Sequence, residues 1–221
     1  MENIYPMRIN KYLAYKNIST RRGADELIEK KLVFINGKIA KLGDKVNESD
    51  KVEVKGNKNP KVYMYYAYNK PVGIETGSPR EDLFPLGRLD KASHGLMILT
   101  NDGRITDKLL NPKYVHEKEY VVKTSKNLRS NFKQKMEAGV NIEGYNTKKC
   151  KVEIVNENTF RVTLTEGKKH QIRRMCSALF QEVADLKRVR IMNIKLAKLT
   201  PNQLREIKGE ELTTFLSQVL K

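Results

Sequence analysis

The chain has 221 residues, of which 43 are Lys or Arg and 26 are Asp or Glu, so its net charge is +17. This length allows one or two domains with a main core of ordinary size. Such an excess of positive charge is typical of proteins that bind polyanions and argues against an enzyme for small molecules. A generally Lys-rich proteome is the alternative source of the charge.

Cysteine and histidine usage excludes two further classes. Cys150 and Cys176 lie far apart and show no paired spacing, which favours reduced thiols over a disulfide scaffold. His94, His116 and His170 are scattered, so their spacing assembles no metal site. No apolar run approaches ~18 residues, and the N-terminus lacks a signal sequence. We expect a cytoplasmic monomer with no membrane segment.

Residues 1–55 are predicted to form a small domain of two helices and a hairpin. Ser19 or Thr20 can cap the second helix. Asn36-Gly37 is a type I′ turn signal between strands at 32–35 and 38–40, and a further strand is expected at 51–54. The apolar positions that follow helical spacing are Ile9, Tyr12 and Leu13, then Ala24, Leu27 and Ile28.

Basic residues gather at the helix starts and the turn of this domain. Its helix order, its hairpin and the segments 8–13 and 33–37 resemble the S4 RNA-binding domain. The resemblance implies that a rigid helix face presents basic side chains to RNA phosphates. A solvated basic helix pair is the alternative interpretation of this unit alone. The residues expected to contact RNA here are Arg8, Lys11, Arg21, Arg22 and Lys38.

A polar segment at 56–61 is the predicted linker, and residues 62–221 the second domain. Its first strand is the tyrosine-rich run 62–68. The later elements are expected as a strand at 119–123, a helix after Ser125 that ends at Gly139, a hairpin of 149–157 with 159–165, a helix at 169–179, two strands within 182–198 and a closing helix carrying Leu212, Phe215, Leu216 and Val219. This pattern predicts an α+β fold with a mixed, largely antiparallel sheet and flanking helices.

One acidic residue stands out in this second domain. Asp90 lies between Arg88 and Lys91, immediately before an apolar run that begins at Gly95. Neighbouring positive charge keeps a carboxylate ionised, and an ionised carboxylate can attack an electrophile or abstract a proton. A surface ion pair is the other interpretation of an Arg-Leu-Asp triplet alone.

Two further motifs carry candidate site residues. Lys118-Glu119-Tyr120 begins a charged strand, and its aromatic ring could hold an unstacked base. In the segment 164–175 a strand turns at Gly167 into a helix, which places basic residues near a helix N-terminus that favours anions.

Together, the segments 87–103, 116–120 and 164–175 resemble the three motifs of the RsuA-type pseudouridine synthases. The resemblance implies that Asp90 is the essential carboxylate, that Tyr120 stacks on the target uracil and that Arg173 pairs with Asp90. We expect these three side chains to converge in one basic cleft, with Arg173 bonded to the Asp90 carboxylate directly or through one water. The residues expected to contact RNA here are Arg88, Lys118, Lys169 and Arg174.

The resemblance implies conversion of a uridine in structured RNA to pseudouridine, without cofactor, metal or energy source. The segments 148–152 and 188–193 resemble the branch that acts on large-subunit (23S) rRNA, the F type. The segment 74–86 is shorter than in that family, which leaves RNA selection open. Alternatives are a synthase for tRNA or 16S rRNA, and a non-catalytic RNA-binding factor for ribosome assembly. The combined presence of Asp90, Tyr120 and Arg173 argues against the latter.

Overall fold

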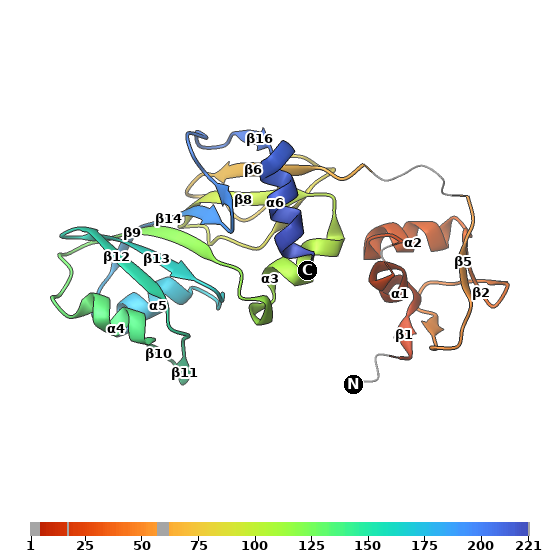
Figure 1. Ribbon diagram of the computed structural model, residues 1–221, viewed down its shortest axis with the longest axis horizontal. Helices are drawn as coiled ribbons and strands as arrows, with labels where there is room; N and C mark the ends of the chain where they lie inside the picture. Colours follow the sequence, from red (N-terminus) through yellow and green to blue (C-terminus); the bar gives the residue numbers. More distant parts are fainter. Residues whose placement is uncertain (1–4, 17, 57–61, 221) are drawn as a thin grey trace. The chain divides into compact units, whose positions relative to one another are not determined.

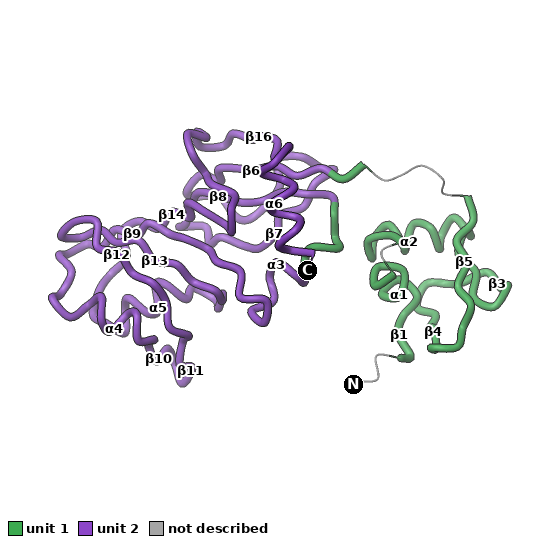
Figure 2. Tube along the Cα trace, viewed as in Figure 1, with its two compact units in different colours: residues 1–63, 102–106 green, residues 64–101, 107–221 purple. Residues whose placement is uncertain are grey.

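The computed structural model describes residues 5–16, 18–56 and 62–220. The chain divides into two compact units, one of residues 1–63 with 102–106 and the other of residues 64–101 with 107–221 (Figure 2). Apart from Gly56, the predicted linker 56–61 lies outside the described residues. The finer limits of the two domains stay predictions.

The first unit forms the predicted helix pair and hairpin. Residues Ile9, Leu13, Ala24 and Val33 are buried in its core. The two strands β1 and β4 pair with each other, and a three-stranded sheet has the order β3-β2-β5. Its elements are β1 (Met7–Arg8), α1 (Ile9–Tyr15), α2 (Arg21–Glu29), β2 (Val33–Ile35), β3 (Lys38–Ile39), β4 (Lys45–Val46), β5 (Val52–Val54) and the 3₁₀ helix η1 (Gly103–Ile105).

Local sequence signals explain the ends of these elements. The Thr20 hydroxyl accepts a hydrogen bond from the Gly23 N–H at 3.1 Å, so Thr20 rather than Ser19 caps α2. Asn36 and Gly37 both have positive φ, at 50° and 78°, as a type I′ turn requires. The hairpin prediction is therefore confirmed.

The second unit is built on a nine-stranded sheet of order β12-β13-β9-β14-β8-β6-β16, with β15 paired to β14 and β7 paired to β8. All of these pairs are antiparallel except β14 with β8, which confirms a mixed, largely antiparallel sheet. The strands are β6 (Tyr65–Lys70), β7 (Phe84–Leu86), β8 (His94–Thr100), β9 (Lys118–Thr124), β12 (Lys151–Asn156), β13 (Thr159–Leu164), β14 (Val183–Ile191), β15 (Ile194–Lys195) and β16 (Leu204–Glu206).

Helices flank this sheet, as the α+β prediction expects (Figure 1). Helices α4 and α5 bury Phe132, Met136 and Met175 in one core cluster with Val122 and Phe160 of the sheet. The other elements of the unit are α3 (Thr106–Leu110), η2 (Pro112–Tyr114), α4 (Phe132–Ala138), β10 (Asn141–Ile142), β11 (Tyr145–Asn146), α5 (Gln171–Ala178) and α6 (Gly209–Val219). No helix of the described segments is long and apolar enough to cross a membrane.

The helix expected after Ser125 is shorter than predicted. Helix α4 begins at Phe132 and ends, as expected, at Gly139. The Ser125 N–H donates to the Glu182 carbonyl, and the Leu128 N–H donates to the Glu157 carbonyl. These long-range backbone hydrogen bonds hold the segment as a loop. It therefore forms no helix, although its apolar residues are spaced as in one.

Candidate active site

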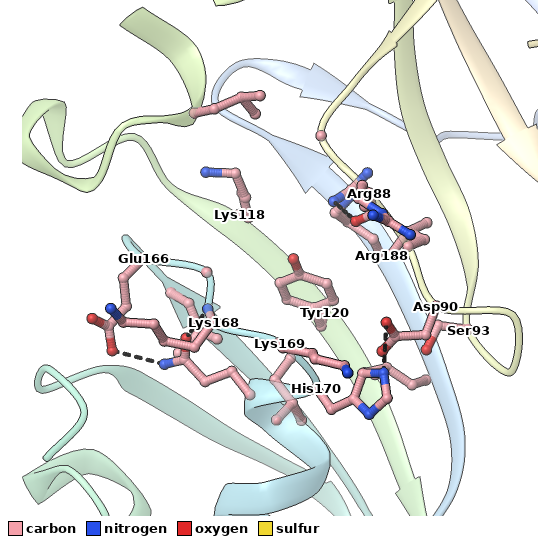
Figure 3. Close-up of a pocket in the computed structure, with 18 residues that line it drawn as sticks. Arg88, Asp90, Ser93, Lys118, Tyr120, Glu166, Lys168, Lys169, His170 and Arg188 are labelled. Atoms are coloured by element: carbon pink, nitrogen blue, oxygen red, sulfur yellow. Dashed lines mark hydrogen bonds and ion pairs between the residues drawn. The ribbon is translucent and has the colours of Figure 1, made fainter. Parts of the chain in front are cut away.

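Three segments that are distant in the sequence line one open cavity of about 650 Å³ in the second unit (Figure 3). They are the loop between β7 and β8, the start of β9, and the loop from β13 into α5; β14 adds Leu186 and Arg188, and α3 adds Leu110. The polar side chains that line the cavity are Arg88, Asp90, Ser93, Lys118, Tyr120, Glu166, Lys168, Lys169, His170, Gln171 and Arg188.

The loop that carries Asp90 is held by a buried lysine. The Lys70 ammonium, at the end of β6, is fully buried and donates to the carbonyls of Pro71 at 3.0 Å, Asp90 at 3.3 Å and Ser93 at 2.7 Å. Burial lowers the pKa of Lys70, and the charge of Asp90 partly opposes this. Thr76 adds two hydrogen bonds to the backbone of Leu89. The Asp90 carboxylate therefore projects from a fixed backbone.

Sheet register places three side chains on one face beside Asp90. Tyr120 of β9 lies directly opposite Arg188 of β14, and Lys118 is two residues before Tyr120 on the same face. Gly95 of β8 pairs with Arg188, where an added Cβ would lie 2.3 Å from the Arg188 carbonyl oxygen. Only glycine permits this approach, so it brings β8 and the Asp90 loop close to Arg188.

A buried carboxylate fixes the loop into α5. Glu166 accepts hydrogen bonds from the Tyr145 hydroxyl at 2.6 Å, the Lys148 N–H at 3.0 Å and the Gln171 amide at 2.7 Å. Burial raises the pKa of the Glu166 carboxyl, but these hydrogen bonds outweigh it and hold the pKa below its usual value. The loop therefore presents Lys168, Lys169 and His170 to the cavity from an anchored base.

His170, and not Arg173, forms the direct contact with Asp90. Its Nε2 atom lies 3.2 Å from the Asp90 Oδ1 atom. The expected direct contact from Arg173 is wrong, because Nη2 of that guanidinium donates to the Ala92 carbonyl at 2.9 Å and the Ser93 hydroxyl at 3.4 Å. Its Nη1 atom donates to the Val183 carbonyl at 3.1 Å. Arg173 thus binds the residues that follow Asp90 in its loop.

The expected RNA contacts divide by environment. Arg88 and Lys169 are exposed at the cavity, and Lys118 is half-buried inside it. Arg174 instead pairs with Glu143 at 2.6 Å and donates to the carbonyls of Lys169 and Ile142. The five basic residues expected to contact RNA in the first unit are all exposed, namely Arg8, Lys11, Arg21, Arg22 and Lys38.

Four side chains of the site are not singled out by sequence reasoning: Lys70, Glu166, His170 in its contact with Asp90, and Arg188. For Lys70 the available signal is a lysine at the end of an apolar strand, where burial needs carbonyl partners. Arg188 lies in a strand of alternating character, and only the register with Tyr120 shows that its side chain faces the cavity. The register between two strands cannot be read from the spacing of residues in the sequence.

The two cysteines are poorly suited to act as nucleophiles. Burial raises the pKa of the Cys150 thiol to about 11 and that of Cys176 to about 12, so both remain protonated and weakly nucleophilic. Within residues 5–16, 18–56 and 62–220, no three His, Cys, Asp or Glu side chains are arranged to hold a metal ion. Asp90 is thus the carboxylate that the cavity exposes beside an aromatic ring and several cations.

Comparison with known proteins identifies two families that match the chain. The RNA pseudouridylate synthase family matches residues 64–178, and the S4 domain matches residues 7–52. The dual-specificity RNA pseudouridine synthase RluF of Escherichia coli (strain K12) is 41% identical over 93% of this chain and 77% of its own length. The ribosomal large subunit pseudouridine synthase B of Bacillus subtilis (strain 168) is 32% identical over 93% of each chain.

A solved pseudouridylate synthase structure superimposes with a TM-score of 0.70 at 25% identity, covering 96% of this chain and 99% of the other. The chain therefore belongs to the RNA pseudouridylate synthase family, in the RsuA-type group with an N-terminal S4 domain. It is an isomerase that acts on RNA.

Proposed function

We propose that the protein converts a specific uridine of 23S rRNA to pseudouridine, with Asp90 as the catalytic carboxylate. The observation that carries the proposal is the cavity that exposes Asp90 beside Tyr120 within a ring of basic side chains. The relatives support the RNA class, since one is named a dual-specificity RNA synthase and another a large-subunit synthase.

The chemistry assigns each side chain a part. The target uridine leaves its helix, because the base must detach from the ribose, turn and rejoin through carbon. Tyr120 stacks on the uracil, and Asp90 either attacks C1′ or takes the C2′ proton. Arg173 acts as a positioning residue through the carbonyl of Ala92 and the hydroxyl of Ser93. No metal, cofactor or energy source is needed for an isomerisation of this kind.

Basic residues outside the reacting atoms hold the RNA. Arg88 and Lys169 at the cavity meet phosphates, and the S4 domain adds further phosphate contacts through its exposed basic side chains. The first unit supplies affinity in this scheme and takes no part in the chemical step, since Asp90 and Tyr120 both belong to the second unit.

Two measurements test the proposal. Pseudouridines are mapped in 23S rRNA, 16S rRNA and tRNA from cells with and without this gene, and one 23S position should lose its modification. Expressing the Asp90→Asn variant in cells that lack the gene should not restore the modification at that position. The reason is that an amide keeps the size of the carboxyl but cannot act as nucleophile or base. A missing position in tRNA or 16S rRNA alone would refute the 23S target, and unchanged RNA in all three would favour a non-catalytic factor.

A further inference from the structure

The cavity is lined by two cationic side chains that form no ion pair with a carboxylate of the described residues, Lys118 and Arg188. Arg188 is 2% exposed. Its Nε atom donates to the Leu96 carbonyl at 2.7 Å and its Nη1 atom to the Arg88 carbonyl at 3.4 Å. Its Nη2 atom is buried and finds no partner among the described residues. A buried donor of a charged group that is left unpaired is costly, so this atom points to a missing acceptor.

Lys118 gives independent evidence for the same missing acceptor. In the described part of the chain its amine forms one hydrogen bond, to the His116 carbonyl at 3.5 Å, and no ion pair. Burial and, secondarily, the charge of Arg188 lower the pKa of Lys118 to about 8. The carboxylates on the same cavity are engaged elsewhere, Asp90 with His170 and Glu166 with Tyr145 and Gln171.

The position of this pair follows from the strands. Arg188 faces Tyr120 across β14 and β9, and Lys118 is on the same face of β9. In Figure 3 the Tyr120 ring lies between Asp90 and His170 on one side and Lys118 on the other, with its hydroxyl directed away from His170, toward the space between Lys118 and Arg188. A uracil stacked on Tyr120 with its ribose at Asp90 therefore turns its far edge, which bears a carbonyl oxygen, toward the two cations.

During the reaction, negative charge moves from Asp90 to the uracil base. When the C1′–N1 bond breaks, its electron pair stays with the base, which becomes a uracil anion with charge on N1 and the two carbonyl oxygens. Asp90 loses its negative charge in the same step, either as an ester to C1′ or as an acid that has taken the C2′ proton. One negative charge therefore passes from the Asp90 end of the cavity to the base.

We infer that Lys118 and Arg188 form a second catalytic pair, which stabilises the detached uracil anion through hydrogen bonds to its carbonyl oxygens. This inference rests on the proposed function. Preorganised donors aimed at developing charge act on the transition state and lower the barrier more than they tighten substrate binding. An RNA phosphate is the other anion that the pair could receive, and it would raise affinity instead.

The test separates these outcomes by the parameter that changes. Lys118→Met and Arg188→Lys are compared with wild type by release of tritium from C5-labelled uridine, in single turnover with excess enzyme, on transcripts of 23S rRNA, 16S rRNA and tRNA. We expect Lys118→Met to reduce the saturating rate about 100-fold. Its Kd for the RNA should change by less than about threefold, and Arg188→Lys, which keeps the charge, should lose less activity.

Lys169→Met is the matched comparison, since Lys169 is an exposed lysine on the same cavity. Its defect should lie in Kd, with the salt dependence of log K reduced by about one phosphate contact. The same pattern in Lys118→Met would overturn the inference in favour of a phosphate site. An unchanged rate in Lys118→Met would overturn it outright, whereas a wild-type protein that modifies no transcript would overturn the proposed function itself.

The pH dependence of kcat/KM gives a second test, because a purely structural role of Lys118 would not change it. In wild type, kcat/KM should fall as the pH rises through about 8, because the Lys118 ammonium loses its proton. This decrease in kcat/KM should be absent in Lys118→Met. If the decrease persisted in that variant, it would arise from another titrating group. The other titratable or charged groups that face the cavity are Arg88, Asp90, Tyr120, Glu166, Lys168, Lys169, His170 and Arg188.

Discussion

Replacing Lys118 by Met should stabilise the protein at pH 7 while it removes activity. The lysine is half-buried and has no carboxylate partner in the described structure, so the folded state bears the cost of an unbalanced charge. Lowering its pKa from the usual 10.5 to about 8 corresponds to about 3.4 kcal/mol at 1.36 kcal/mol per pH unit. Solvent screening at a half-buried amine reduces this, and we expect a gain of about 1–2 kcal/mol.

The pH dependence of the stability gained by Lys118→Met shows whether the charge of the lysine is its cause. Below about pH 8 the lysine is protonated in both folded and unfolded chains, so the full cost is present. Between about 8 and 10.5 the unfolded chain binds more protons than the folded one, and wild-type stability rises relative to Lys118→Met. The difference between the two proteins should therefore be largest at pH 7 and should nearly vanish only above the unfolded-chain value of 10.5.

Urea unfolding followed by circular dichroism, at pH values from about 6.5 to 11, measures this difference. Both proteins keep the same first unit, so its unfolding contributes equally to both curves. Lys169→Met controls for the general effect of removing a lysine, and it should change stability by less than about 0.5 kcal/mol because Lys169 is exposed. A destabilised Lys118→Met, or a gain independent of pH, would refute the unbalanced charge.

Three further predictions concern the rest of the molecule. Lys70→Met should cost about 2–4 kcal/mol and lower the turnover rate, because three carbonyls around the Asp90 loop lose their donor; thermal unfolding and single-turnover rates measure this. Phe180→Gly should stabilise by about 1 kcal/mol in urea titrations, because Phe180 is 76% exposed at a φ of 59°, a left-handed conformation that favours glycine. Deleting residues 1–55 should raise KM steeply and flatten the salt dependence of RNA binding, with a smaller effect on saturating turnover of a short RNA; unchanged affinity would contradict an S4-type role.

The elements that sequence predicts well are those fixed by local interactions. Helices α1 and α2 and the hairpin β2–β3 follow from apolar spacing, the Thr20 cap and the Asn36-Gly37 turn, all within a few residues. The segment before helix α4 shows the limit, since it has helical spacing but its Ser125 and Leu128 N–H groups donate to the carbonyls of Glu182 and Glu157, which are distant in sequence. Long-range backbone partners decide that segment, and spacing does not reveal them.

The active site, too, can be predicted only in part from the sequence. Asp90 and Tyr120 are found from their motifs, and both line the cavity. Arg173 is predicted to bind Asp90 directly or through one water, but the direct contact comes from His170, because the left-handed turn at His170, with φ of 52°, directs that ring to the carboxylate before α5 begins. A motif fixes residue types, whereas one backbone turn decides which of two neighbouring nitrogen-bearing side chains makes the contact.

The locally unfavourable features of this chain gather around the cavity. His170 holds a left-handed backbone without a capping hydrogen bond, Lys118 keeps an amine of depressed pKa, and Arg188 leaves a buried nitrogen without a partner in the described structure. Strain and unpaired charge persist where surrounding structure enforces them, and they concentrate at functional sites. The costs at Lys118 and Arg188 are relieved by the same event. An RNA base stacked on Tyr120 would supply acceptors for both cations as charge leaves Asp90, so these costs are largest in the empty enzyme and smallest at the transition state.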